Sequence, residues 1–236
     1  HKIVMNLLYL ITARGGSKGI PGKNGKMLHR LPLLLYSINV ARELSSDEWV
    51  CLSTDDDNLI ALAENAGLKV PFKRPAELAS DTAGSDQVIL HALDYYESQN
   101  KKVDAIVLLQ PTSPFRTAQH VREALAMYSG EEDMILGVKE TKSNPYYLLV
   151  EENEEGYLHK SKKLPAHITR RQDAPKVYEI NGAIYIINAA SMKLKQSLSK
   201  FEKIKKYVMS EEDSLDLDTP LDWKFAELIL SEKNKL

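Results

Sequence analysis

A glycine-rich, basic segment directly follows an apolar run near the start of the chain. Residues 10–26 read LITARGGSKGIPGKNGK, and the apolar run 7–11 has the length of a buried strand. Glycine allows positive φ and close approach of the backbone to a ligand, so several N–H groups can face one side of the loop. The segment also carries four cationic side chains, which are Arg14, Lys18, Lys23 and Lys26. These residue types together suit the binding of a polyphosphate anion.

Two well-known phosphate-binding loops do not fit this segment. A P-loop needs Gly, four residues, then Gly-Lys-Ser/Thr, but here Ser17 stands at the place of the first glycine and Asn24 at the place of the Ser/Thr. A dinucleotide fingerprint needs G-x-G, and no glycine of the segment has another two residues further on. A solvated basic loop is the plain alternative. The position directly after a buried strand, where α/β folds bind ligands, favours the ligand-binding interpretation.

Two aspartates near the other end of the chain have the spacing of a metal-binding pair. The acidic run 211–220 reads EEDSLDLDTP. In an extended chain, residues two apart share a face, so Asp216 and Asp218 point one way and the leucines beside them the other. Two carboxylates on one face suit a hard cation such as Mg²⁺, which commonly takes one or two carboxylates plus phosphate oxygens. On these residues alone, a solvated acidic face is the competing interpretation.

Polar side chains also follow two further apolar runs. The run 49–53 leads into three successive aspartates at 55–57, which can cap the helix that follows. Of the three, Asp55 is the one that we expect to face a ligand. The run 103–109 leads into Gln110, and two prolines after it fix a rigid turn. A side-chain amide at that place can form hydrogen bonds in two directions.

The apolar runs alternate with segments of helical periodicity through the first 138 residues. This alternation predicts an α/β fold of three layers, with a mostly parallel sheet and right-handed crossovers. We expect strands at 7–11, 49–53, 68–72, 103–109 and 134–138, and helices at 32–44, 57–66, 86–98 and 118–129.

The alternation stops after residue 138. Residues 146–161 favour a hairpin around 153–156, and residues 160–176 are polar and irregular. A strand at 181–187 then resumes the core, and a helix at 221–232 follows the acidic run. We therefore predict an α/β core formed by residues 2–138 and 177–236, with an inserted segment at 139–176.

The composition excludes several classes of protein. Of the 236 residues, 43% are hydrophobic and 27% are charged, and the formal net charge is -2, so nothing indicates a nucleic acid polymer or an anionic membrane as partner. No apolar run has the length of a membrane span. A single cysteine, Cys51, excludes an intramolecular disulfide and fits the cytoplasm. No Cys/His cluster or Ser/His/Asp order indicates zinc binding or acyl transfer.

Five motifs, in order and along almost the whole chain, resemble those of the CMP-sialic acid synthetases, also called acylneuraminate cytidylyltransferases. The family patterns are R-x-x-S-K-G-x-P-x-K-N, R-P-x-x-L-A-x-D-x-x-x-S, Q-P-T-S-P-x-R, N-G-A-I-Y and S-x-D-x-D-T. In this chain they fall at 14–24, 74–85, 110–116, 181–185 and 214–219. The related Kdo cytidylyltransferases usually have arginine for Lys18 and proline for Asn24, so the match favours the sialic-acid branch.

The resemblance implies a fold, a reaction and an assembly. The fold is the Rossmann-like one of nucleotide-diphospho-sugar transferases. The reaction transfers CMP from CTP to the anomeric hydroxyl of a nine-carbon α-keto sugar acid and releases pyrophosphate, with Mg²⁺ as cofactor. In the family, the segment that corresponds to 139–176 forms a dimer contact and reaches into the partner's site, so the resemblance also implies a homodimer.

The resemblance assigns roles to particular side chains. It implies CTP binding by Arg14, Gly15, Gly16, Ser17, Lys18, Lys23, Asn24, Arg74 and Ser85. It implies sugar binding by Gln110, Arg171 and Tyr185, metal binding by Asp216 and Asp218, and catalytic roles for Arg14, Lys23, Asp216 and Asp218. Ser85 can alternatively cap the helix that begins there.

The acceptor and one mechanistic role stay open. The sialic-acid branch often has a basic residue where this chain has Tyr147, so Kdo or a deaminated, legionaminic or pseudaminic acid is an alternative acceptor. The general base is not evident from the sequence. A non-catalytic nucleotide-binding regulator on the same fold is the alternative from another class, and the intact Gln110, Asp216 and Asp218 argue against it.

Overall fold

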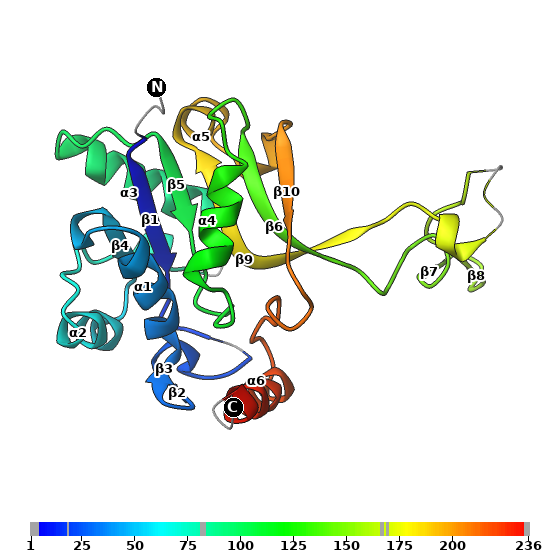
Figure 1. The fold of residues 1–236 in the computed structure, drawn as a ribbon, viewed down its shortest axis with the longest axis horizontal. Helices are drawn as coiled ribbons and strands as arrows, with labels where there is room; N and C mark the ends of the chain where they lie inside the picture. Colours follow the sequence, from blue (N-terminus) through cyan, green and yellow to red (C-terminus); the bar gives the residue numbers. More distant parts are fainter. Residues whose placement is uncertain (1–4, 18, 81–83, 166–167, 169, 234–236) are drawn as a thin grey trace.

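A six-stranded sheet forms the centre of the protein (Figure 1). The structure is a computed structural model that describes residues 5–17, 19–80, 84–165, 168 and 170–233. The strands of the sheet are β1 (Leu7–Thr12), β4 (Val50–Ser53), β5 (Ala105–Leu108), β6 (Met134–Glu140), β9 (Tyr178–Asn188) and β10 (Ile204–Val208). Their order across the sheet is β10-β6-β9-β5-β1-β4.

Helices cover both faces of the sheet and create two hydrophobic cores. On one face, Tyr9 and Ile11 of β1 pack with α1 (Leu33–Leu44), α2 (Asp57–Asn65) and α4 (Ala118–Ala126). On the other face, Leu8 and Leu10 pack with α3 (Ser85–Ser98) and α5 (Ala189–Lys195). Successive side chains of a strand point to opposite faces, so a continuous apolar run serves both cores. The predicted three-layer α/β architecture is confirmed.

The sheet is parallel except at β9. Strand β1 runs parallel to β4 and β5, and β6 runs parallel to β10. Strand β9 is antiparallel to both of its neighbours, β5 and β6. The register between β6 and β9 shifts at Gly137, where a Cβ would lie 2.8 Å from the Asn181 Oδ1 atom, so this position requires glycine. The prediction of a mostly parallel sheet is therefore confirmed.

The structure corrects several predicted elements. The described chain has no strand at 68–72, where Pro71 lacks an N–H for a ladder and its carbonyl instead accepts a hydrogen bond from the Tyr95 hydroxyl at 3.0 Å. Helix α4 ends earlier than predicted, and helix α5 and strand β10 were not predicted. The sequence also gave no sign of the short hairpin formed by β2 (Met27–Leu28) and β3 (Leu31–Pro32). Short 3-10 helices occur at Lys23–Gly25, Asp47–Trp49, Ala76–Leu78, Arg171–Asp173 and Leu198–Lys200.

Between β6 and β9 the chain leaves the sheet as an arm, drawn from green to yellow in Figure 1. The arm carries the antiparallel hairpin of β7 (Val150–Glu152) and β8 (Leu158–Lys160), and every residue of both strands is exposed. The predicted hairpin is confirmed, although its strands are shorter than expected. Figure 1 shows the arm projecting far beyond the helices that cover the sheet.

Helix α6 (Pro220–Lys233) closes a third, smaller core beneath the glycine-rich segment. Trp223 and Ala226 of α6 pack there with the fully buried Leu217 and with Ile20 of the loop. The predicted alternation at 215–218 thus holds for Leu217, whose burial fixes the segment 215–218 that carries both aspartates, although this segment is not part of any sheet. Within the described residues, none of the helices has both the length and the apolar character needed to cross a membrane.

A fully buried arginine ties three elements together. Arg116, which is 2% exposed, donates from Nη1 to the carbonyl oxygens of Gln110 at 3.2 Å and Ala183 at 3.0 Å. Its Nη2 donates to the Ser37 Oγ atom of α1 at 2.6 Å. Burial lowers the pKa of Arg116 to about 9, which still leaves the guanidinium charged at neutral pH. The turn after β5 is thereby fixed to β9 and to α1.

We expect Arg116→Met to lower the free energy of unfolding by about 2–5 kcal/mol, because three oxygen atoms lose their hydrogen bonds to the guanidinium while most of the side-chain volume is kept. Urea unfolding followed by circular dichroism measures the change. Arg122→Met is the matched control, since Arg122 forms an exposed ion pair with Glu43 at 2.9 Å and its loss should cost about 0–1 kcal/mol. Equal effects of the two substitutions would contradict the role given to Arg116.

Candidate active site

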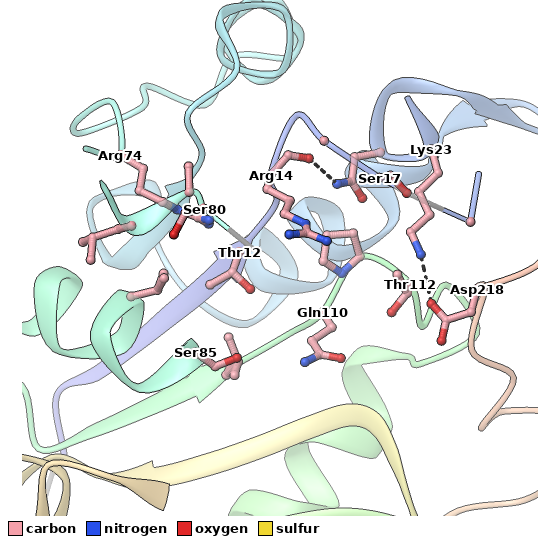
Figure 2. Close-up of a pocket in the computed structure, with 18 of the residues that line it drawn as sticks. Thr12, Arg14, Ser17, Lys23, Arg74, Ser80, Ser85, Gln110, Thr112 and Asp218 are labelled. Atoms are coloured by element: carbon pink, nitrogen blue, oxygen red, sulfur yellow. Dashed lines mark hydrogen bonds and ion pairs between the residues drawn. The ribbon is translucent and has the colours of Figure 1, made fainter. Parts of the chain in front are cut away.

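A cavity of about 670 Å³ lies at the carboxyl ends of β1 and β5 (Figure 2). In the view of Figure 2, Arg74 and Ser85 lie toward one end, Lys23 and Asp218 toward the other, and Arg14 between them. The sequence-predicted site residues that line it are Arg14, Gly16, Ser17, Lys23, Asn24, Arg74, Ser85, Gln110, Asp216 and Asp218. Residues separated by up to 204 positions, from Arg14 to Asp218, thus meet at one edge of the sheet.

The first part of the glycine-rich loop is held by hydrogen bonds to two side chains, those of Asp55 and Asn24. The Gly15 N–H donates to the Asp55 Oδ1 atom at 3.1 Å, and the buried Asn24 donates from Nδ2 to the Arg14 carbonyl at 3.2 Å. Gly15 itself is not among the residues that line the cavity, and Lys18 lies outside the described residues. Asp56, rather than Asp55, caps α2 by accepting from two backbone N–H groups. The Asp55 carboxylate, which does not cap the helix, accepts the hydrogen bond from the loop instead.

The second part of the loop contacts the segment 215–218, which carries the two aspartates. A Cβ at Gly19 would lie 2.1 Å from the Asp218 carbonyl oxygen, so only glycine permits this contact without a shift of the backbone. Lys23 donates from Nζ to the Leu217 carbonyl at 2.8 Å and to the Asp218 Oδ1 atom at 3.1 Å. The loop and the segment that carries the two aspartates therefore form one wall of the cavity.

The acidic pair combines the half-buried carboxylate of Asp216 with the exposed carboxylate of Asp218. The Asp216 Oδ1 atom is buried and has no hydrogen-bond partner, whereas the Asp218 side chain is 70% exposed. Burial raises the pKa of Asp216; the Thr112 hydroxyl and the charge of Lys23 act against this, and the charge of Asp218 adds to it. An unpartnered carboxylate oxygen beside a second carboxylate fits a hard cation. The described residues contain no group of three or more metal-ligating side chains, so the remaining ligands of such an ion would be phosphate or water.

Arg74 and the start of α3 form the other end of the cavity. Arg74 is 6% exposed, and it donates from Nε and Nη2 to the hydroxyl and carbonyl oxygens of Ser53 at 3.0 and 2.6 Å. Burial lowers the pKa of Arg74, and the nearby Asp55 carboxylate opposes that shift. Ser85 does not cap α3, because the N-cap residue is Gly84 and no side chain caps the helix. The Ser85 hydroxyl thus remains available to a ligand.

Gln110 lies between the two ends of the cavity, directly after β5. Its backbone carbonyl accepts from both Arg116 and the Ser37 hydroxyl. Its side chain contacts β9 at Gly182, which has a φ of +70° and where a Cβ would lie 2.7 Å from the Gln110 Oε1 atom. A glycine is therefore required at 182 for the amide to take this position.

Two predicted sugar-binding residues do not line the cavity. Tyr185 lies on β9 near Asp216, and burial, together with the charge of Asp216, raises the pKa of Tyr185. Arg171 is exposed on the arm, and its guanidinium carbon lies 5.4 Å from the centroid of the Tyr147 ring. The site of this chain is therefore formed without Arg171.

Sequence reasoning assigned no role to several lining residues. Thr112 belongs to the Q-P-T-S-P-x-R motif, and its place two residues after Gln110 is the signal that could have found it. Apolar side chains gave no signal, since they look like any other core residues. The unassigned lining residues are Thr12, Gly19, Leu78, Ala79, Ser80, Val88, Ile89, Leu108, Pro111 and Thr112.

Comparison with known proteins decides the family. A family model described as cytidylyltransferase matches residues 8–233. The chain belongs to the cytidylyltransferase family. The match extends from β1 through α6, so every element that forms the cavity falls within the family's shared sequence pattern.

Sequence relatives of this cytidylyltransferase-family chain cover nearly all of it. It is 33% identical to the post-translational flagellin modification protein B of Campylobacter coli, over 97% of this chain and 96% of that protein. It is 30% identical to a CMP-N,N'-diacetyllegionaminic acid synthase of Legionella pneumophila, over 96% and 97%. It is 34% identical to an N-acylneuraminate cytidylyltransferase of Escherichia coli, over 97% of this chain but 53% of that protein.

The cytidylyltransferase fold is also recognised in three dimensions. A CMP:2-keto-3-deoxy-manno-octonic acid synthetase, solved in complex with CTP, superposes with a TM-score of 0.69 over 97% of this chain and 99% of that one. The sequence identity of the pair is 15%, so this likeness concerns the fold alone. It agrees with the predicted nucleotidyltransferase architecture.

We expect Asp216→Asn to stabilise the folded protein at neutral pH. Because the pKa of Asp216 is raised above its ordinary value of 3.8, the folded protein holds this proton more tightly than the unfolded chain, and ionisation at higher pH costs stability. Asparagine does not ionise, so its advantage should be smallest near pH 4, grow as the pH rises through the raised pKa of Asp216, and then stay constant. Urea unfolding over this pH range measures it.

The matched control for this prediction is Asp57→Asn. Asp57 is an exposed residue that pairs with Lys73 on the surface at 2.8 Å, so its substitution should change stability little at any pH in the range. A stability difference for Asp216→Asn that does not vary with pH would show that the carboxylate is not the cause.

Proposed function

We propose that this protein transfers CMP from CTP to the anomeric hydroxyl of a nine-carbon α-keto sugar acid and releases pyrophosphate. The observation that carries the proposal is the single cavity that joins a cationic glycine loop to a pair of aspartates. A triphosphate needs the first feature and its metal ion needs the second. The names of the two relatives that are synthases or transferases of such acids support the choice of acceptor class.

The nucleotide end is assigned to the loop and to the start of α3. Arg14, Lys18 and Lys23 would balance the charge of the triphosphate, while backbone N–H groups of the loop contact its oxygens. Arg74 and Ser85 would meet the cytosine and its ribose at the other end. The residues proposed for CTP are Arg14, Gly15, Gly16, Ser17, Lys18, Lys23, Asn24, Arg74 and Ser85.

The proposed cofactor is Mg²⁺, held by Asp216 and Asp218. The fit rests on the unpartnered, buried Asp216 Oδ1 atom and on an all-oxygen donor set. When bound, such an ion neutralises charge on the reacting phosphates. Attack of the sugar hydroxyl on the α-phosphorus in line with the leaving pyrophosphate needs little covalent help from the protein, so the chain's contribution is positioning and electrostatics.

The acceptor is assigned to residues around β9. Gln110 would bind the acyl sugar with its amide, held in place by Gly182, and Tyr185 would lie beside it. Arg171 would bind the sugar carboxylate, since a planar guanidinium pairs with a carboxylate through two hydrogen bonds. Because Arg171 sits on an exposed arm, we assign it to the site of a second copy of the chain.

A homodimer with shared sites follows from this assignment. We propose a core of residues 2–138 and 177–236, and an arm of residues 139–176 that contacts the partner. A two-stranded hairpin is at best marginally stable alone in water, which supports a covering partner for β7 and β8. The arm also exposes several large apolar side chains, namely Leu148, Leu149, Val150, Tyr157 and Leu158. The single, buried Cys51 supports a cytoplasmic location.

Release of pyrophosphate tests the proposal directly. The purified protein is incubated with Mg²⁺, CTP or UTP, and a panel of acids: N-acetylneuraminate, legionaminic acid, pseudaminic acid and Kdo. We expect release with CTP and at least one nine-carbon acid. Release with Kdo alone would contradict the acceptor class, and absence of release with all of them would favour a non-catalytic nucleotide-binding regulator.

In that assay we expect Asp218→Asn to lose nearly all turnover and to keep its fold. The carboxylate is a proposed metal ligand, while the exposed position of the side chain leaves the core undisturbed. Asp213→Asn is the matched control, because Asp213 lies in the same acidic run but does not line the cavity. Normal turnover of Asp218→Asn at low Mg²⁺ would show that the metal assignment is wrong.

We expect Arg171→Ala to raise KM for the sugar acid and to leave KM for CTP unchanged, because the arm does not line the nucleotide cavity. Arg171→Lys should rescue poorly, since an ammonium cannot form the paired contact. Steady-state kinetics with each substrate varied separately measure both constants. An unchanged KM for the sugar would contradict the carboxylate contact.

Mixing two impaired variants, at a sugar concentration far below the raised KM of Arg171→Ala, tests whether the site is shared. A dimer of one Arg171→Ala subunit and one Asp218→Asn subunit contains one site with both native residues. We therefore expect the mixture to regain activity that neither variant has alone. Recovery of no activity, after subunit exchange has been verified by mass spectrometry, would contradict the cross-subunit assignment.

A further inference from the structure

The ammonium group of Lys23 lies against the segment that carries Asp216 and Asp218. It donates to the Leu217 carbonyl, which lies between the two aspartates in sequence, and to the Asp218 carboxylate. The Lys23 side chain is 12% exposed, so this position is packed against the protein and is not one of many solvent conformations. The residue assigned to the triphosphate thus points at the metal pair in this structure.

The loop around Lys23 is held at the same place by a second contact. Gly19 lies against the Asp218 carbonyl so closely that a Cβ would be 2.1 Å from the oxygen. Directly after Lys23, Asn24 joins the end of the loop to its start through the Arg14 carbonyl. The position of the described part of the loop is therefore coupled to the segment that carries Asp216 and Asp218.

The two kinds of cation cannot share the pair at close range. A divalent ion bound by Asp218 lies roughly 2.0–2.1 Å from a carboxylate oxygen, while the ammonium is 3.1 Å from the Oδ1 atom of the same carboxylate. A divalent ion and the Lys23 ammonium that bind the same carboxylate repel each other. An ion pair with an exposed carboxylate such as that of Asp218 contributes little, so the divalent ion weakens the contact of Lys23. Without a divalent ion, in contrast, two adjacent carboxylates repel each other and gain from a nearby lysine.

We propose that Lys23 is a resident counter-cation of the Asp216–Asp218 pair, that a divalent cation displaces it, and that this exchange frees Lys23 for the triphosphate. The proposal rests on the proposed function for the identity of the anion that receives Lys23. Its consequence is an order of events at one site: the ion that neutralises the phosphates also delivers the lysine that binds them.

Binding of Mn²⁺ in the absence of nucleotide tests the exchange. The electron paramagnetic resonance signal of free Mn²⁺ gives the affinity of each variant. Lys23→Met removes the competing charge and keeps most of the side-chain volume, so we expect it to bind Mn²⁺ about three- to tenfold more tightly than the native protein. An equal or weaker affinity of Lys23→Met would overturn the proposal.

Two control variants define where the ion binds. Lys26→Met should keep native affinity, because Lys26 belongs to the same loop but lies over the Trp223 ring, 4.6 Å from its centroid. Asp218→Asn should lose most Mn²⁺ binding in both the native and the Lys23→Met background. If Asp218→Asn binds Mn²⁺ like the native protein, the ion is not at this pair and the proposal is overturned.

Chemical labelling of lysines provides a second measurement on the unaltered side chain. Acetylation of the native protein, read by mass spectrometry, should modify Lys23 several-fold faster with saturating Mg²⁺ than without it. The exposed Lys26 should react at one rate in both conditions. Equal protection of Lys23 with and without Mg²⁺, under conditions where the ion is bound, would overturn the displacement.

Failure of this inference and failure of the proposed function give different results. If the native protein releases pyrophosphate and Lys23→Met does not bind Mn²⁺ more tightly, the exchange alone is wrong. If Lys23 exchanges with Mn²⁺ but no sugar acid yields pyrophosphate, the exchange stands and the proposed reaction is wrong.

Discussion

The parallel pairing of β1 with β5 is the constraint on which the site depends. Their register, from Leu7 opposite Ala105 to Leu10 opposite Leu108, brings the carboxyl ends of both strands to the same edge of the sheet, with β1 extending further, to Thr12. The glycine-rich loop leaves one strand and the Gln110 turn leaves the other, so both necessarily border one cavity. Arg116 then fixes the turn to β9 and α1, which prevents the two loops from moving apart.

The site and the residues that support it contain charged groups whose burial costs free energy. Asp216 is half-buried with an unpartnered oxygen, and Arg74 and Arg116 are almost fully buried. Each of these groups lost water on folding, and hydrogen bonds to neutral oxygens replace that water only in part. Sites that act on charged substrates commonly retain such groups at the expense of stability. The charge of a bound substrate or metal ion would offset the desolvation of Asp216 and Arg74, which face the cavity. Arg116 does not line the cavity, and only its hydrogen bonds to the protein offset its desolvation.

Much of this arrangement could be predicted from the sequence. The strong signals were local: apolar runs bounded by glycine, the Asp-x-Asp alternation around Leu217, and the change of periodicity after residue 138. The weak signals depended on tertiary contacts. Strand β10 was missed because its side chains are mostly exposed at a sheet edge, and 68–72 was wrongly predicted as a strand because its burial comes from packing rather than from a ladder. No sequence pattern could show that Gly19 and Lys23 contact the segment that carries Asp216 and Asp218.

The antiparallel direction of β9 has a consequence for how the arm can evolve. Glu140, the last residue of β6, pairs with Tyr178, the first residue of β9, so the arm leaves and re-enters the sheet at adjacent positions. Topologically the whole arm is the loop of a β-hairpin, and the entropic cost of lengthening such a loop rises only slowly with its length. Insertions, deletions and whole replacements in the arm therefore leave the sheet and the nucleotide cavity unchanged. Under the proposed assignment of Arg171, the contact with the partner and the contact with the acid's carboxylate would both change through one replaceable segment, while the core stays constant.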